Sequence, residues 1–160
     1  MPAEIRPASA QDVPLILGFI RELAEFEKLS NQVVATEEAL RASLFPANCR
    51  PAAECVLAFE KGTPAGYALF FTTFSTFLAK PGLWLEDLYV KPPLRHRGIG
   101  KTLILHVAKL ANDRGCGRME WSVLDWNAPA IKFYDSLGAK SLPDWRICRL
   151  TGEDLARYSR

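Results

Sequence analysis

The sequence predicts one mixed α/β domain that spans residues 1–160. Three observations lead to this prediction. The apolar residues change along the chain between the 3.6-residue period of helices and the patterns of strands. The chain has 160 residues, a length that typically forms one domain. It is 49% hydrophobic and 11% aromatic, enough to fill a core and too apolar for a disordered chain.

The first part of the chain predicts one short strand and two helices. Residues 4–7 form the strand, and Ser9 is the expected N-cap of the first helix, with Asp12 three residues later in place of the usual Glu or Gln. Thr36 caps a second, shorter helix that ends near Leu44. The first helix extends to about Leu29, because apolar residues recur at helical spacing: Val13, Ile16, Leu17, Ile20, Leu23 and Ala24.

Strands dominate the middle of the chain. Residues 55–59 and 66–74 are apolar runs joined by a turn that contains Gly and Pro, so they predict an antiparallel hairpin. Residues 83–90 are apolar on both faces, as expected for a central strand covered from both sides. A helix over residues 98–113 follows and stops at a glycine.

The last part of the chain predicts a helix between two strands. The helix covers residues 127–137 and ends at Gly138. The strands cover residues 119–124 and 145–150.

Charge and cysteine usage exclude several classes of function. Twenty basic and 18 acidic residues give a net charge of +2, too balanced for the basic surface typical of nucleic-acid binding. No apolar run approaches the roughly 20 residues of a membrane span, and residues 1–6 lack the features of a secretory signal. Four separated cysteines and two histidines lack metal-ligand spacing. We therefore expect a cytoplasmic protein without metal, nucleic acid or membrane partners, with four reduced and mostly buried thiols.

A basic segment with two glycines, Arg95-His96-Arg97-Gly98-Ile99-Gly100-Lys101, is the strongest functional signal. It follows an apolar strand and opens a helix. The two glycines let the backbone turn tightly and bring its amides close to an anion, and the helix N-terminus adds partial positive charge. The spacing differs from a Walker A loop, and the third glycine of a dinucleotide-binding fingerprint is missing. We interpret the segment as a diphosphate cradle.

The pattern Arg95-x-x-Gly98-x-Gly100 resembles the acetyl-CoA pyrophosphate motif of the GNAT family of N-acetyltransferases. Residues 85–90, 124–127 and 133–139 resemble its diamine acetyltransferase branch, and within that branch residues 74–76 and 123–127 look closest to thialysine N-acetyltransferases. The resemblance extends over residues 5–150. It implies a GNAT-like α/β fold, with a mixed, mostly antiparallel central sheet and helices on both faces, acetyl-CoA as co-substrate and a homodimer.

The resemblance also implies the reaction, which is direct attack of a small molecule's primary amine on the thioester. The amine would belong to a thialysine-like or lysine-like compound or a diamine. Glu86 would help to take the amine's proton, directly or through water, from an apolar strand that desolvates it. Tyr134 would protonate the leaving thiolate, because a phenol keeps its proton at neutral pH. A structural carboxylate and a core tyrosine are the respective alternatives.

Two groups of binding residues follow from the resemblance. Asn127 is in addition a good N-cap for the helix that it precedes. Acetyl-CoA would contact Leu88, Tyr89, Val90, Arg95, His96, Arg97, Gly98, Ile99, Gly100, Lys101, Asn127, Ala128, Pro129, Ala130 and Tyr134. The acceptor would contact Phe26, Glu27, Ser75, Glu86 and Asp87.

The identity of the acceptor stays open at this point. Ser75 stands where the spermidine/spermine enzymes carry an aspartate, so long polyamines are expected to be poor substrates. One alternative is acetylation of a protein N-terminus or lysine. Another is a non-catalytic module that binds acyl-CoA.

Overall fold

A computed structural model describes residues 3–159 of the chain. The chain divides into two compact units, of which the first ends at Ser122 and the second begins at Val123. The first unit contains, in order, β1 (Glu4–Pro7), α1 (Val13–Phe26), α2 (Glu37–Leu44), β2 (Glu54–Glu60), β3 (Thr63–Ser75), β4 (Lys80–Val90), α3 (Ile99–Asp113) and β5 (Arg118–Glu120). The second unit contains α4 (Ala128–Ser136) and α5 (Gly152–Ala156).

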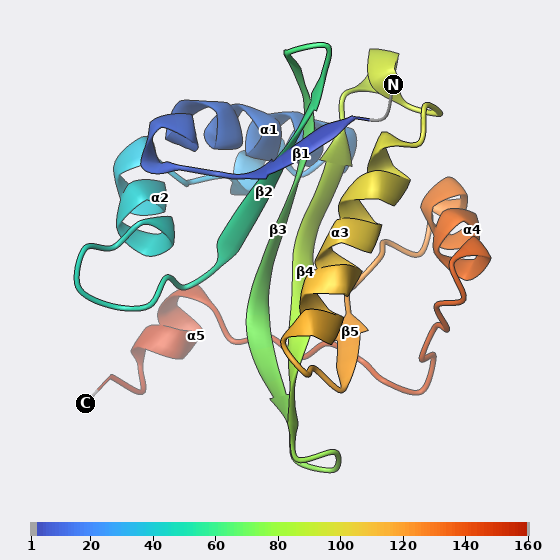
Figure 1. The fold of residues 1–160 in the computed structure, drawn as a ribbon. Helices are drawn as coiled ribbons and strands as arrows, with labels where there is room; N and C mark the ends of the chain where they lie inside the picture. The colour runs from blue at the N-terminus through green and yellow to red at the C-terminus, as the bar shows by residue number, and fades with distance from the viewer. Residues whose placement is uncertain (1–2, 160) are drawn as a thin grey trace. The chain divides into compact units, whose positions relative to one another are not determined.

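The sheet of the first unit has the strand order β1-β2-β3-β4-β5 (Figure 1). Each pair of neighbours is antiparallel except β4 and β5, which are parallel. The hairpin expected from the two apolar runs is therefore confirmed as β2–β3, and β4 lies inside the sheet as a central strand. Strands β3 and β4 are longer than the sequence indicated, because the ladder extends to the pair Ser75 and Lys80.

Alternating side chains of the sheet divide the core between two faces. Cys55, Leu57, Tyr67 and Leu69 pack with Ile16, Phe19 and Leu44 of α1 and α2. Their neighbours along β2 and β3 point to the other face, where α3 contacts β3 and β4. The expected mixed, mostly antiparallel sheet with helices on both faces is confirmed.

The helix caps follow the local sequence. The amide of Ser9 donates to Asp12 Oδ2 at 2.8 Å, which places the expected capping box on the short 3₁₀ turn before α1. The same carboxylate pairs with Arg6 at 2.8 Å. Thr36 accepts from the Ala39 amide at 3.1 Å and caps α2, as predicted. Helix α1 ends at Phe26, three residues before the expected end, because Lys28 has a left-handed φ of 61°.

Two predictions for the last strands need correction. Strand β5 covers Arg118–Glu120, so it begins one residue before the expected strand over residues 119–124 and ends four residues earlier. Residues 145–150 form no strand in the described chain, although their pattern is apolar. The exposed fractions of Trp145 and Ile147 are 79% and 70%. A strand needs a neighbour for its backbone hydrogen bonds, and periodicity alone does not supply one.

The four cysteines are free thiols, as expected, but their burial differs from the prediction. Cys55 is buried and Cys116 is partly buried, while Cys49 and Cys148 are exposed. Both exposed residues lie in irregular segments, where packing does not cover them. No helix among residues 3–159 has the length and apolar character needed to cross a bilayer.

Candidate active site

The loop between β4 and α3 contains the segment that the sequence predicted to be a diphosphate cradle. His96 and Gly98 have left-handed φ angles of 62° and 81°, and α3 begins directly afterwards at Ile99. The Thr102 amide donates to the Gly98 carbonyl at 2.9 Å and makes the first bond of the helix. The amides of the preceding helical residues therefore have no carbonyl partner within α3. This geometry, with the dipole of a 15-residue helix, fits an anionic diphosphate.

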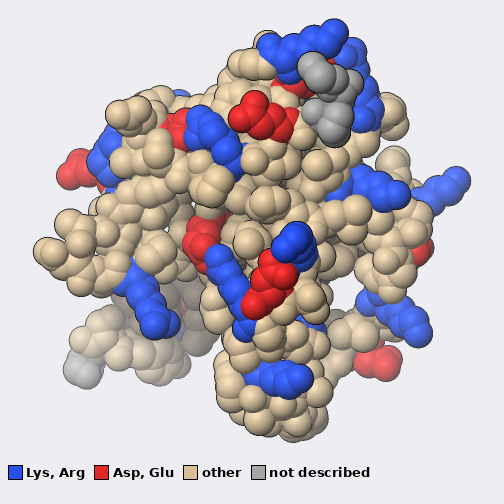
Figure 2. Space-filling view, viewed as in Figure 1, with Lys and Arg blue, Asp and Glu red and all other residues tan. Residues whose placement is uncertain are grey.

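The basic side chains around the cradle have different surroundings. Arg95 donates from Nε to the Val90 carbonyl at 2.9 Å, and its guanidinium lies 4.6 Å from the centre of the Phe26 ring. Arg97 pairs with Glu60 at 2.9 Å, whereas Lys101 is exposed on the first turn of α3. Figure 2 shows Lys and Arg side chains gathered at the top of the view, over the end of the sheet where this loop lies. The amides at the start of α3 are thus accompanied by nearby positive charge.

The part of β4 next to the cradle has an open edge. Strand β5 pairs with β4 only over residues 82–84, so residues 85–90 have no strand partner on that side within the described chain. Leu88, Tyr89 and Val90 lie in this part. The Tyr89 hydroxyl donates to Glu22 at 2.9 Å. Backbone groups at an unpaired edge can bind an extended amide chain, such as the pantetheine arm of a CoA thioester.

The two neighbouring acids of β4 have opposite surroundings. Glu86 is exposed, and it accepts a hydrogen bond from Trp84 Nε1 at 2.9 Å. The expected desolvation of Glu86 is therefore wrong for this structure. Burial falls on Asp87, whose Oδ2 accepts from the Tyr67 hydroxyl at 2.7 Å. Burial raises the pKa of Asp87, and the hydrogen bond from Tyr67 opposes that shift.

The end of α1 brings a second acid towards Asp87. Glu27 follows the last residue of the helix and is partly buried. Burial raises the pKa of Glu27, and the negative charge of Asp87 raises it further. Phe26 beside it is 40% exposed and lies under Arg95. The structure thus places two expected acceptor residues near the base of the cradle, together with Asp87.

Ser75 does not join this group within one chain. It pairs with Lys80 at the far end of the β3–β4 hairpin, whereas Asp87 pairs with Leu69. Six residues along a strand correspond to about 20 Å. Ser75 is buried, and its hydroxyl accepts from the Leu78 amide at 3.3 Å, which closes the turn of the hairpin.

The second unit carries the remaining expected residues. Asn127 Oδ1 accepts from the Ala130 amide at 3.3 Å, so its predicted role as N-cap of α4 is confirmed. Ala128 and Pro129 form the first turn of this helix. Tyr134 lies in its second turn, is partly buried, and has its ring centre 5.3 Å from that of Phe133.

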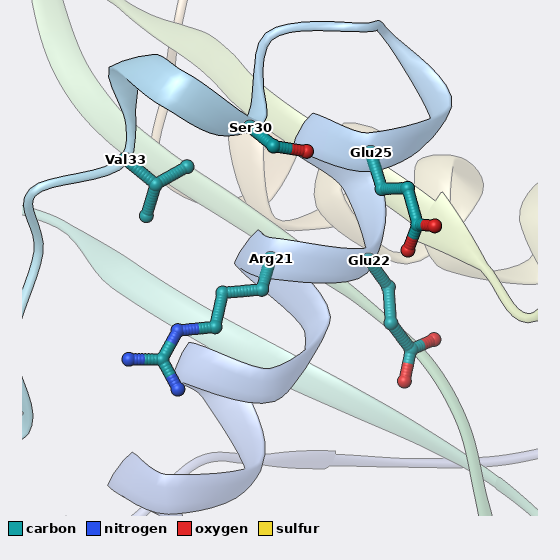
Figure 3. Close-up of a pocket in the computed structure, with 5 residues that line it drawn as sticks. All are labelled: Arg21, Glu22, Glu25, Ser30 and Val33. Atoms are coloured by element: carbon teal, nitrogen blue, oxygen red, sulfur yellow. The ribbon is translucent and has the colours of Figure 1, made fainter.

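Sequence reasoning missed the partners of the acids and a nearby hollow. Tyr67 and Trp84 looked like core residues, because a hydrogen bond from the side chain of an aromatic residue leaves no mark on hydrophobic periodicity. The hollow, of about 350 Å³, lies beside α1 and is lined by Arg21, Glu22, Glu25, Ser30 and Val33 (Figure 3). Glu22 there also faces Lys91 at 3.7 Å. Within residues 3–159, no group of three or more acidic, His or Cys side chains is arranged to hold a metal ion.

Comparison with known proteins agrees with the fold. The chain belongs to the Acetyltransferase (GNAT) family, whose model matches residues 20–139. Proteins of this family use acetyl-CoA as co-substrate, and the predicted N-acetyltransferase activity is confirmed at this level.

Several relatives are similar over nearly the whole chain. A thialysine N-epsilon-acetyltransferase of Sus scrofa is 42% identical, over 93% of this chain and 92% of its own. An L-ornithine N5-acetyltransferase of Arabidopsis thaliana is 36% identical, over 96% and 86%. Among solved structures, an integron cassette protein of V. cholerae has a TM-score of 0.79 and 24% identity, over 100% of this chain and 99% of that one. This last similarity concerns the fold alone.

Proposed function

We propose that this enzyme acetylates the primary amine of a small cationic molecule that resembles lysine, thialysine or ornithine. The observation that carries the proposal is the pair Glu27 and Asp87, two partly buried acids close enough for one charge to affect the other. Desolvated carboxylates favour a cationic ligand. The names of the relatives, which refer to thialysine and ornithine, support the same class of acceptor.

Acetyl-CoA would be held mainly by backbone groups. The first amides of α3 would bind the diphosphate, with Lys101, Arg95 and Arg97 as nearby charges. The open edge of β4 would pair with the pantetheine arm through residues 88–90. The first turn of α4, over residues 127–130, would contribute a further contact. The bound thioester supplies the acetyl group.

The proton transfers would use one carboxylate and one phenol. Glu86 is exposed to solvent, so it would take the proton of the attacking amine through a water molecule. The Trp84 indole holds the Glu86 carboxylate at 2.9 Å and fixes its direction. Tyr134 would return a proton to the leaving thiolate. The amine then attacks as a neutral nucleophile, and CoA leaves as a thiol.

A homodimer forms part of the proposal, and the tip of the β3–β4 hairpin is its candidate interface. Phe74, Phe77 and Leu78 are 63%, 100% and 49% exposed there. An apolar patch of this kind is typical of an interaction surface. Sedimentation at micromolar concentration should show a dimer, and a Phe77→Glu variant should shift it towards monomer. Only monomer in the unchanged protein would contradict this part of the proposal.

An acceptor screen with acetyl-CoA tests the function. Thiol release would be followed with thialysine, lysine, ornithine, putrescine, spermidine, spermine and a peptide with a free N-terminus. We expect the highest kcat/KM for an amine with a short aminoalkyl arm. A tenfold preference for spermine would contradict the ranking, and a preference for the peptide would favour a protein acceptor. Acetyl-CoA binding without turnover of any amine would favour a non-catalytic module.

A further inference from the structure

The hydroxyl of Tyr67 is a polar group inside the apolar core. Tyr67 has no exposed surface, and its ring stacks on Phe19 with centres 5.4 Å apart and planes 5° from parallel. Stacking of this kind prevents the ring from turning towards another partner. The hydroxyl donates to Asp87 Oδ2 at 2.7 Å, within the range of a strong hydrogen bond to a carboxylate. Burial raises the pKa of the phenol well above its usual value, so Tyr67 remains a donor.

The carboxylate of Asp87 is held by Tyr67 but is not fully enclosed. The Oδ2 atom accepts the hydrogen bond from the Tyr67 hydroxyl. Asp87 is only partly buried, so part of its surface remains accessible. The carboxylate is therefore fixed from the core side and available from the other side.

Two acids near Asp87 favour its neutral form, and one hydrogen bond favours its charged form. Glu86 neighbours it on β4 and Glu27 approaches it from the end of α1, and negative charge on either opposes a charge on Asp87. Cys55 of β2 is a buried thiol whose pKa of about 12 keeps it neutral. The hydrogen bond from Tyr67 acts in the opposite direction and favours the carboxylate.

We propose that Tyr67 is a positioning residue for the acceptor amine, acting through Asp87: its hydroxyl holds Oδ2 in the core so that Oδ1 faces the amine as a charged ligand. The inference rests on the proposed function, because it assumes that Asp87 binds a cationic acceptor. Tyr67 itself touches neither substrate.

Tyr67→Phe tests the proposal, since it removes one oxygen and keeps the ring. We expect the KM of thialysine to rise about tenfold or more, in the range of a lost hydrogen bond to a charged group. The kcat and the KM of acetyl-CoA should differ from those of the unchanged protein by about twofold or less. The acid limb of kcat/KM should move to higher pH, because Asp87 loses the bond that favours its charge. In an Asp87→Asn background the same substitution should have little further effect on KM.

Ile16→Val is the matched control, because Ile16 is fully buried in the same cluster and carries no polar group. It should lower the thermal midpoint slightly and leave the acid limb in place. If Tyr67→Phe fails to fold, 3-fluorotyrosine at position 67 gives a stronger donor of nearly equal size and should move the acid limb to lower pH.

A carboxyl-carbon NMR titration of Asp87 separates the role of Tyr67 from the proposed function of the enzyme. It needs no turnover, and we expect a higher pKa for Asp87 in Tyr67→Phe than in the unchanged protein. An unchanged pKa with an unchanged KM for thialysine would overturn the role of Tyr67. A shifted pKa in an enzyme that acetylates no small amine would overturn the proposed function and leave only the structural part of the inference.

Discussion

The guanidinium of Arg95 lies 4.6 Å from the centre of the Phe26 ring, while its Nε donates to the Val90 carbonyl at 2.9 Å. One side chain thus joins the cradle loop, the end of β4 and the end of α1. The Tyr89 ring lies 5.7 Å away on the same guanidinium. Since Phe26 is an expected acceptor residue and the loop is the expected site for the diphosphate, Arg95 connects the two halves of the proposed active site.

Arg95→Lys should therefore weaken the binding of both substrates. Lysine keeps the charge but cannot donate to Val90 and cover a ring at the same time. A cation–π contact corresponds to about 0.5–2 kcal/mol, so we expect both KM values to rise about threefold or more. Initial-rate kinetics with each substrate varied would measure this. The control is Arg114→Lys, since Arg114 likewise lies over an aromatic ring, 6.0 Å from the centre of Phe70, and its other partner is the carboxylate of Glu54. A change confined to one substrate would show that Arg95 does not couple the sites.

Gly100→Ala should reduce the affinity for acetyl-CoA without damage to the fold. A Cβ at this position would meet only Val90 Cγ2 at 3.7 Å, an ordinary contact, and alanine stabilises a helix by about 1 kcal/mol over glycine. Any loss of affinity for acetyl-CoA would therefore come from the added methyl group, which would hinder the approach of the ligand. A β-branched residue at position 98 or 100 should lower the affinity tenfold or more, about 1.4 kcal/mol. Titration calorimetry would measure the binding.

Gly62→Ala is the control for backbone strain at Gly98. Both glycines have left-handed φ angles, 78° and 81°, and open space around the missing Cβ. The substitution at either position should cost about 1–2 kcal/mol of stability, but only the change at position 98 should weaken acetyl-CoA binding. Equal affinity for acetyl-CoA in the Gly62→Ala and Gly98→Ala variants would contradict a role of the cradle in acetyl-CoA binding.

Tyr134→Phe should lower kcat and leave the binding of acetyl-CoA unchanged. The substitution keeps the ring beside Phe133 and removes the proton donor. General acid catalysis typically contributes about 10²–10⁴-fold. Single-turnover kinetics, in which product release does not limit the rate, would measure the loss. Tyr158→Phe, at an exposed position, is the control. Full activity of Tyr134→Phe under these conditions would make Tyr134 a packing residue.

Glu86→Gln should lower kcat/KM most at pH values below the pKa of the substrate amine. There the amine carries a proton that must be removed before attack, and glutamine cannot accept it. Activity should recover in part at higher pH, because free amine then forms without assistance. Glu54→Gln, which removes a carboxylate paired with Arg114 at the other end of α3, is the control. A loss that is the same at every pH would contradict a role in proton removal.

Asp87→Asn should stabilise the fold at neutral pH while it weakens amine binding. Burial raises the pKa of Asp87 in the folded protein, so the charged form costs stability. Below the unfolded pKa of about 3.9, Asp87 is protonated in both the folded and the unfolded state. Its charge therefore costs no stability there, and the unchanged protein and Asp87→Asn should be equally stable. The cost develops as the pH rises from the unfolded pKa towards the folded pKa and is complete above the folded pKa. Denaturant melts from pH 3 to pH 8 would measure this, and a lower stability of Asp87→Asn at pH 8 would contradict it.

The sequence by itself determined the features that depend on neighbours along the chain. The spacing of the two glycines and the helix that follows them defined the cradle, since a turn and its free amides are local. The N-caps Thr36 and Asn127 were predicted for the same reason, because each bonds to an amide three residues later. The apolar runs of β2, β3 and β4 identified the sheet, because burial imposes the same pattern on any central strand.

Only the tertiary structure decided how adjacent acids differ. Glu86 and Asp87 are neighbours in sequence, yet one is exposed and the other is held by Tyr67, twenty residues earlier. Side chains alternate across a strand, and which face meets which helix is set by packing. The same holds for Arg95, whose contact with Phe26 joins segments 69 residues apart in the sequence. Residues 145–150 show the converse, because an apolar pattern does not form a strand without the hydrogen bonds of a neighbour.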